Sequence, residues 1–580
     1  MSAEHVTEAA PPAGHALLEQ LRAAGDALGR ALSWLEAVRP RNVLAVFVIV
    51  EWLTILGVAL VVRHNGWIYY QGGDQLWNYV TAWLWGHGRL AHTSIGYGWS
   101  IVLFPFALLG GPNLVSPLPF ILLFNVLVLM PVAILSAYGI GQRLGGRLFG
   151  YWTALLWVVV PLIGIEYTNA GYHQRYTELL LPQTLGLAVM SDFPSMAVSA
   201  AAAYFVLRAA QDDDRSDALL AGVLVGIAIG IKPSNAPVLV GGALALLVAR
   251  RWRSMVWGTV GLAPSILALT VWKAQGEGTI PLFHRATATG EVLVASAAPV
   301  LALGLHIHTY FHPSWQRFAQ ELDSMREHFW SVRVLEGLFV AGVIGLLRKS
   351  RPAGVFFGGW FATVLLVKWA NQGSGTVDNA DLLRQTISAV PAALVILAGV
   401  LLLFPGVPQK LPRPKPRPWT SRRFRAGLVA ALLTLFAAVP IALAAALPVL
   451  ENSDTISYYT QTGSSLSAPF AVDSGWRPAA TVGRGGVSLT WSRLDPLGGT
   501  MDYVVLRAPA SRAIVCDQTA GGAQCRLNAT PVDATHGTRF VDHIGAGRWT
   551  YRIGAAASWI NDPTAGDIYV VGRAVTVTAR

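Results

Sequence analysis

The most constraining feature of this chain is a succession of long apolar stretches separated by short polar segments. A helix needs about 20 apolar residues to cross a lipid bilayer, and somewhat fewer inside a bundle. Of the 580 residues, 53% are hydrophobic and 13% are charged, which excludes a soluble protein. We therefore predict a polytopic α-helical membrane protein with about eleven spans. They are expected at residues 42–62, 115–138, 147–165, 193–210, 216–231, 234–250, 254–273, 334–348, 354–371, 386–405 and 426–447.

The positions of Arg and Lys indicate which loops face the cytoplasm. The net charge of +11 comes largely from short clusters between the apolar stretches, as the positive-inside rule describes, so it does not indicate nucleic-acid binding. Residues 1–41 are polar, Arg-bearing and partly amphipathic, and we expect a cytoplasmic N-terminal segment without a signal peptide. The inside loops are then 142–147, 208–215, 250–253, 348–351 and 410–425. The outside loops are 63–114, 166–192, 232–233, 274–333 and 372–385, and the C-terminus is expected outside.

After the last predicted span the sequence changes to short alternating stretches. Residues 487–491, 503–507, 549–553 and 568–572 alternate apolar and polar side chains and are separated by Gly, Pro and Asp. This pattern predicts a small extracytoplasmic all-β sandwich. The order of these stretches resembles a fibronectin type III domain. We expect it at 476–580, after a transmembrane domain at 42–450 and a linker at 451–475.

Both cysteines of the chain, Cys516 and Cys525, fall in this outer domain. An oxidising compartment would allow them to form a disulfide that closes a hairpin, which agrees with the charge-based topology. Two free buried thiols are the alternative. The bias toward Ala, Arg and Gly is typical of a high-GC bacterium.

Polar residues near the outer ends of the spans are informative, because charged groups are costly in a membrane. Asp74 follows the first span, where partial burial suits a carboxylate to act as a general base; exposure to lipid headgroups is the alternative. The spacing of apolar residues over 76–84 predicts an amphipathic helix along the membrane surface. Residues 99–109 are too short to span the membrane, and we expect them to be re-entrant or packed on the bundle.

The second outside loop contains two further candidates. It includes His173 and ends at Asp192, just before a span. Asp192 is expected at the same membrane level as Asp74, where two carboxylates can share a divalent cation or divide base and electrostatic roles. The alternative is N-capping of the following helix by Ser191 or Asp192, with Pro194 in its first turn.

Three of the cations in predicted outside loops are candidate phosphate contacts. Lys232 occupies a tight turn between two spans, against the positive-inside trend. Arg384 precedes the tenth span, and Arg285 lies in the long fourth outside loop. A cation at the outer lipid edge can bind a lipid-linked phosphate. Snorkelling to lipid headgroups is the alternative.

Together, these motifs resemble the GT-C superfamily of integral membrane glycosyltransferases over residues 42–405. The resemblance rests on Gly73-Asp74 and Gly96-Tyr97-Gly98 in the first loop, on Asp192 opening a later span, on Gly222, Gly226 and Gly230 before Lys232-Pro233, and on Arg384 before a late span. Members of this superfamily transfer a sugar from a polyprenyl-phosphate donor to an acceptor on the outer face, usually with inversion.

The resemblance implies a role for each candidate. Asp74 would be the catalytic base, Asp192 would orient the acceptor or a metal, and Lys232 and Arg384 would contact the donor phosphate. Beside these, we expect His173 to orient the acceptor or a metal and Arg285 to contact the donor phosphate. General chemistry agrees, since a hydroxyl nucleophile needs a positioned base and a departing phosphate needs cations. The partners are expected to be a lipid-linked sugar and a glycan, lipid or protein acceptor at the plasma membrane.

Two points stay open at this stage. Several members carry paired acids at the first site, whereas Gln75 follows Asp74 here, so we do not expect a two-carboxylate metal site within that loop. A divalent cation (Mg, Mn or Ca) is still a candidate cofactor, with Asp192 as its candidate ligand. The alternative function is a transporter or flippase of a lipid-linked saccharide, which inverted repeats and ionisable residues near the midplane would favour. No convincing repeat is evident.

Overall fold

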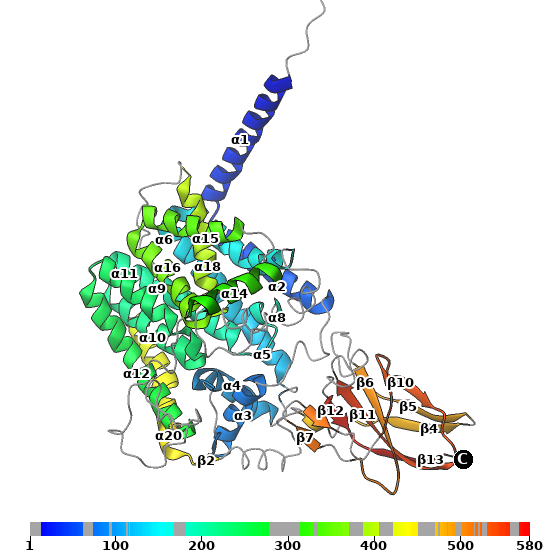
Figure 1. The fold of residues 1–580 in the computed structure, drawn as a ribbon. Coiled ribbons are helices and arrows are strands. Elements are labelled where there is room, and N and C mark those ends of the chain that lie inside the picture. The colour runs from blue at the N-terminus through cyan, green and yellow to red at the C-terminus, as the bar shows by residue number, and fades with distance from the viewer. Residues whose placement is uncertain are drawn as a thin grey trace, which may run out of the picture.

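The structure is a computed structural model in which helices form a bundle and strands form the C-terminal region (Figure 1). The described residues are 13–61, 74–91, 95–111, 114, 117–166, 181–277, 314–328, 334–369, 387–404, 422–450, 470–473, 476–483, 485–492, 502–514, 517–519, 522–524, 530–556 and 568–579. Every statement below about structure concerns these residues.

Each predicted span contains helical residues. The corresponding elements are α2 (Pro40–Val61), α5 (Leu118–Phe124) with η1 (Asn125–Leu129) and α6 (Met130–Glu166), α9 (Asp192–Asp212), α10 (Arg215–Ile231), η3 (Pro233–Asn235) with α11 (Pro237–Val248), α12 (Trp252–Glu277), α15 (Val334–Lys349), α16 (Arg351–Val364) with η5 (Leu365–Trp369), η6 (Ile387–Ala389) with α18 (Val390–Gly399) and η7 (Val400–Leu403), and α19 (Arg422–Leu433) with η9 (Thr434–Ala438) and α20 (Val439–Ala446). The other helices are α1 (Ala13–Ala37), α3 (Asp74–Gly86), α4 (Tyr97–Gly110), α8 (Leu181–Thr184) and α14 (Trp315–His328).

Length and composition alone would allow 5 of the described helices to cross a membrane. One of these, Leu118–Leu162, covers two predicted spans. They are separated at Gly146, whose φ of 87° is outside the helical range. This break falls in the predicted inside loop 142–147, so the multipass character is confirmed, while the number of eleven spans stays a prediction.

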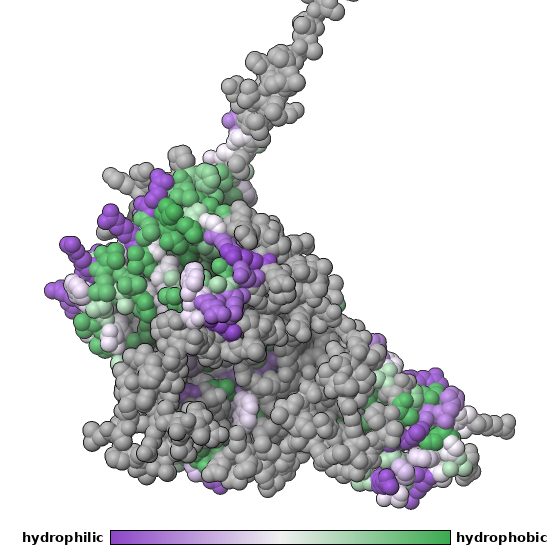
Figure 2. Space-filling view, in the orientation of Figure 1, coloured by the Kyte–Doolittle hydropathy of each residue, from purple (hydrophilic) through white to green (hydrophobic). Residues whose placement is uncertain are grey.

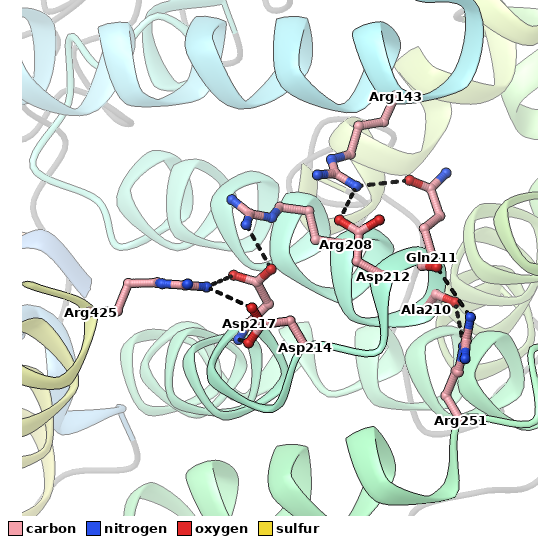
Figure 3. A network of polar contacts seen from close by, with 9 residues as sticks. All are labelled: Arg143, Arg208, Ala210, Gln211, Asp212, Asp214, Asp217, Arg251 and Arg425. Carbon is pink, nitrogen blue, oxygen red and sulfur yellow. Dashed lines mark hydrogen bonds and ion pairs between the residues drawn. The ribbon is translucent and has the colours of Figure 1, made fainter. Parts of the chain in front are cut away.

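Four of the predicted inside loops meet at one end of the bundle (Figure 3). The contacts join Arg143 Nη1 to Asp212 Oδ2 at 2.7 Å, Arg251 Nε to Ala210 O at 3.2 Å, and Arg425 Nη1 to Asp217 Oδ1 at 2.8 Å. They connect α6, α12 and α19 to the α9–α10 hairpin. The charge pattern therefore predicted correctly that these loops share one side.

Asp217 is the most buried member of this network, with 1% of its side chain exposed. Arg208 Nη2 lies 2.8 Å from Asp217 Oδ2, and Arg425 binds the other carboxylate oxygen. A buried carboxylate held by two guanidinium groups is well compensated, whereas the loss of one partner would leave a buried charge. The network thus fixes α9, α10 and α19 to one another at this end.

At the other end, described parts of the first two predicted outside loops contact each other and the segment that follows the last span. Strand β1 (Leu90–Ala91) in the first outside loop pairs in parallel with β2 (Val449–Leu450), which follows the last span. In addition, the Val189 N–H donates to Gln75 Oε1 at 3.2 Å and thereby joins the first and second outside loops.

Helix α3 is not the surface helix that the apolar spacing predicts. Its polar residues Gln75, Asn78 and Thr81 are buried along with its apolar ones. Helix α4 covers it, and Ser100 Oγ donates to Asn78 O at 2.9 Å. The surface prediction was wrong because other parts of the protein bury the polar face of α3 as well as its apolar face. Packing of residues 99–109 on the bundle, as α4, is confirmed.

The outer surface of the bundle is apolar where lipid would contact it. Figure 2 shows hydrophobic side chains gathered over the region of α11, α15 and α16. Exposed residues there include Val240, Leu244, Val340 and Ile344. Such a continuous exposed apolar surface is expected of a membrane protein.

The C-terminal region consists of two sheets. One has the strand order β10 (Arg539–Asp542), β5 (Gly486–Thr490), β4 (Ala479–Gly483); the other has β7 (Asp517–Thr519), β8 (Gly522–Gln524), β12 (Ile568–Gly572), β11 (Gly547–Ala556), β6 (Asp502–Pro509), β9 (Thr530–Thr535), with β13 (Val575–Ala579) on β11 and β3 (Phe470–Asp473) on β12. The rings of Trp491, after β5, and Tyr503, in β6, pack with centroids 5.8 Å apart, so aromatic side chains join the sheets. The predicted β-rich region is confirmed, and β3 lies in the predicted linker. The likeness to a fibronectin type III domain stays a prediction.

Candidate functional site

The central feature of the candidate site is an ion pair between Asp192 and Lys232. Asp192 is the first residue of α9, and Lys232 follows the last residue of α10. Because these helices form a hairpin, both residues lie at the end opposite the arginine network. Lys232 Nζ contacts Asp192 Oδ1, with the Asp192 side chain fully buried and that of Lys232 19% exposed. The sequence analysis placed both residues at outer ends of spans with separate roles, and the structure brings their side chains into contact.

Helix electrostatics favour this arrangement of charges. A helix N-terminus carries partial positive charge and a C-terminus partial negative charge. Asp192 stands at the former and Lys232 at the latter. Ser191, at the N-cap of α9, makes no side-chain capping hydrogen bond to the helix. The two side chains therefore form an ion pair. Neither capping of α9 by Ser191 nor snorkelling of Lys232 alone accounts for this contact.

Asn235 holds the turn that carries Lys232. Its Nδ2 donates to Lys232 O at 3.0 Å and to Ala228 O at 3.3 Å, and its Oδ1 accepts from Ser199 Oγ at 3.1 Å. The side chain is fully buried. The sequence analysis assigned Asn235 no role, although an amide within a buried apolar turn was a usable signal.

The Gly-Tyr-Gly motif of the first outside loop packs against the same turn. A Cβ at Gly96 would lie 2.3 Å from Gly230 O, and one at Gly98 would lie 2.7 Å from Ile231 N. Only glycine permits this approach of α4 to the last turn of α10. Tyr97 Oη donates to Phe436 O at 2.7 Å in the π-helical turn η9. Two motifs that are far apart in sequence thus form one contact beside Lys232.

Asp74 begins α3, but the placement of its side chain lies outside what the structure describes. The next residue, Gln75, is fully buried and accepts the hydrogen bond from Val189 N–H. The start of α3 is therefore connected to the segment that leads into Asp192. The role of Asp74 as a base stays a prediction.

The remaining candidates are not tested by the geometry. His173, Arg285, Arg384, Cys516 and Cys525 lie outside the described residues. Among the residues that are described, no three or more His, Cys, Asp or Glu side chains gather to hold a metal ion. Asp192 faces an ammonium group, so this donor set does not fit a divalent cation.

One protein family matches the part of the chain that contains this site. Residues 176–272 match the family described as dolichyl-phosphate-mannose-protein mannosyltransferase, and this stretch includes Asp192, Lys232 and the whole of α9 to α11. No curated protein sequence matches the chain.

Two solved structures of one archaeal enzyme are similar to the chain. One is the oligosaccharyltransferase AglB from Archaeoglobus fulgidus in complex with an inhibitory peptide and a dolichol-phosphate, at 12% identity. The other is the Archaeoglobus fulgidus oligosaccharyltransferase in its apo form, at 13% identity. Each alignment has a TM-score of 0.35 and covers 71% of this chain and 56% of the archaeal chain. The similarity is too low to carry an argument about function.

The family match falls on α9, α10 and α11, which carry the candidate site. In this part, the chain is similar to the dolichyl-phosphate-mannose-protein mannosyltransferase family.

Proposed function

We propose that the protein transfers a sugar from a polyprenyl-phosphate-linked donor to a glycan, lipid or protein acceptor on the extracytoplasmic side of the plasma membrane. The observation that carries this proposal is the Asp192–Lys232 pair at the end of the bundle opposite the arginine network. The N-terminus is then cytoplasmic and the β-rich region extracytoplasmic.

The proposed reaction is a single displacement with inversion. Asp74 takes the proton of the acceptor hydroxyl as its oxygen bonds to the anomeric carbon. The bond from that carbon to the phosphate oxygen breaks, and polyprenyl phosphate leaves. A positioned base contributes about 10²–10⁴-fold to such a step.

The pair supplies a preorganised cation for the leaving phosphate. Asp192 holds Lys232 in one direction, while the 19% exposure of the Lys232 side chain leaves part of it open to a ligand. A phosphate that approaches this part would be stabilised as its charge develops. Arg384 and Arg285 are proposed as further phosphate contacts, and His173 as an acceptor contact. Within the part of the chain that the structure describes, no group of three or more His, Cys, Asp or Glu side chains offers a ligand set for a divalent cation.

To test this proposal, the purified protein is incubated with a panel of polyprenyl-phosphate sugars and glycan acceptors, and the rate of sugar transfer is measured. We expect Asp74→Asn to lower turnover by at least about 100-fold. Lys232→Met should raise the KM for the donor by about 10-fold or more, since a charge-assisted contact to phosphate is lost. Lys349→Met, which removes a lysine charge from a predicted inside loop, is the matched control and should leave KM unchanged.

Equal turnover by wild type and Asp74→Asn would refute the base assignment. The transporter alternative predicts a different result: no transfer with any donor, together with measurable movement of a labelled lipid-linked saccharide across vesicles.

A further inference from the structure

Residues 185–191, which connect α8 to α9, form irregular backbone inside the bundle. Leu185, Leu187 and Val189 are all at most 5% exposed. Buried backbone without helical hydrogen bonds needs other partners, and this holds most strictly at membrane depth.

Three fully buried side chains from three different elements supply these partners. Gln75 Oε1 in α3 accepts from Val189 N–H at 3.2 Å, and Trp99 Nε1 in α4 donates to Val189 O at 2.8 Å. Asn125 Nδ2 in η1 donates to Gly186 O at 3.1 Å and to Ala188 O at 3.2 Å. Both the N–H and the carbonyl oxygen of Val189 are thus hydrogen-bonded to buried side chains. We call Gln75, Trp99 and Asn125 the loop clamp.

The loop is also fitted sterically to the clamp. Gly186 has a φ of 78°, and a Cβ there would lie 3.1 Å from Asn125 Cβ and 3.0 Å from the Phe193 ring. A side chain at this position would be strained and crowded at once. The clamp therefore specifies one path for the backbone as it enters α9.

This path ends at the carboxylate of the candidate site. Val189 precedes Asp192 by three residues, so a shift of the clamped peptide would be transmitted over a short distance. Functional groups must be held within about 0.5 Å of their productive geometry by the groups that support them. If the loop were free to move, Asp192 would hold the Lys232 ammonium group in several different positions.

We propose that the loop clamp is a set of positioning residues that fixes Asp192, and through it Lys232, for the lipid-linked phosphate. This inference rests on the proposed function of the pair. Gln75, Trp99 and Asn125 bind the backbone of residues 186–189 and are proposed to act through Asp192.

The experiment compares two tryptophans that make the same bond in different places. Trp52 Nε1 in α2 donates to Val126 O at 2.8 Å, the same length as the Trp99 bond. Trp99→Phe should raise the KM for the lipid donor about tenfold with little change in kcat. Trp52→Phe is the matched control and should leave the KM within about twofold. Gln75→Met, which keeps the length of the side chain but loses the acceptor, should act like Trp99→Phe.

A double-mutant cycle with Asp192→Asn separates positioning from general destabilisation. If the clamp acts through Asp192, adding Trp99→Phe to Asp192→Asn should change the KM by less than about twofold. Additive losses, or equal losses for Trp52→Phe, would overturn the inference. If Asp192→Asn and Lys232→Met alone leave transfer unchanged, the proposed function of the pair fails instead. If the wild type transfers no sugar, the same cycle is measured on binding of polyprenyl phosphate, with the same criteria.

Discussion

A single added methyl group should separate α10, the helix that leads to Lys232, from α12. Helices α10 and α12 pack through small residues, and a Cβ at Gly222 would lie 1.9 Å from Gly258 O. Gly222→Ala therefore requires this gap to widen to at least 3.0 Å, the shortest separation that real Cβ atoms show. The obstacle is a backbone carbonyl, which cannot rotate away as a side chain would.

The cost follows from the same geometry. Insertion of a methylene into a packed core costs typically 1–3 kcal/mol, and we expect about 3 kcal/mol here because the whole helix must move. Gly258→Ala, across the same contact, is the matched control. Its Cβ would meet only Ala218 O at 3.6 Å, an ordinary contact. Both changes gain the same intrinsic helix preference of about 0.5–1 kcal/mol.

Unfolding in mixed micelles, titrated with a denaturing detergent and checked for reversibility, measures the difference between the two variants. We expect Gly222→Ala to be less stable than Gly258→Ala by at least about 2 kcal/mol. Stabilities within about 0.5 kcal/mol of each other would refute the close α10–α12 contact.

Two further predictions concern charged groups away from the site. Hydrogen bonds from Ser216 and the charge of Arg425 lower the pKa of Asp214, although burial alone would raise it; the stability that Asp214 contributes is present above its unfolded pKa and should be lost as the pH falls through its folded pKa. The apparent unfolding temperature should therefore fall in acid below about pH 4, less steeply in Asp214→Asn, and parallel curves would contradict this. Tyr551 Oη donates to the buried Asp542 carboxylate at 2.7 Å, so Tyr551→Phe should cost about 1.5–3 kcal/mol, seen as faster limited proteolysis of the β-rich region, and unchanged proteolysis would argue against it.

The sequence was informative where a structural property depends on local composition. Span positions follow from the lengths of apolar stretches, and the common side of the inside loops follows from their Arg and Lys content. The meeting of Asp192 and Lys232 could be anticipated because they open and close two neighbouring spans. Their direct pairing could not, since the sequence suggested a separate role for each.

Contacts between segments that are far apart in the sequence could not be predicted, because they leave no local pattern in it. The bond from Val189 to Gln75 joins residues 114 positions apart, and neither residue alone suggests it. Helix α3 illustrates the same limit. Apolar spacing identifies the apolar face of a helix, but it does not show whether another element also covers the polar face. Trp99 was likewise visible only as a member of an apolar segment.

The most unusual residue of the first loop now has a physical explanation. In the sequence analysis, Gln75 stood where several members of the superfamily that the chain resembles carry a second acid, and this argued against a metal pair with Asp74. Position 75 is fully buried and must accept a hydrogen bond from the Val189 N–H. A carboxylate there would accept the same bond but would bring a charge into a site without solvent, which is costly unless a cation compensates it. The neutral amide supplies the acceptor without that charge. A glutamine at position 75 therefore agrees with both observations: it brings no second acid to the loop, and it binds the backbone that leads to Asp192.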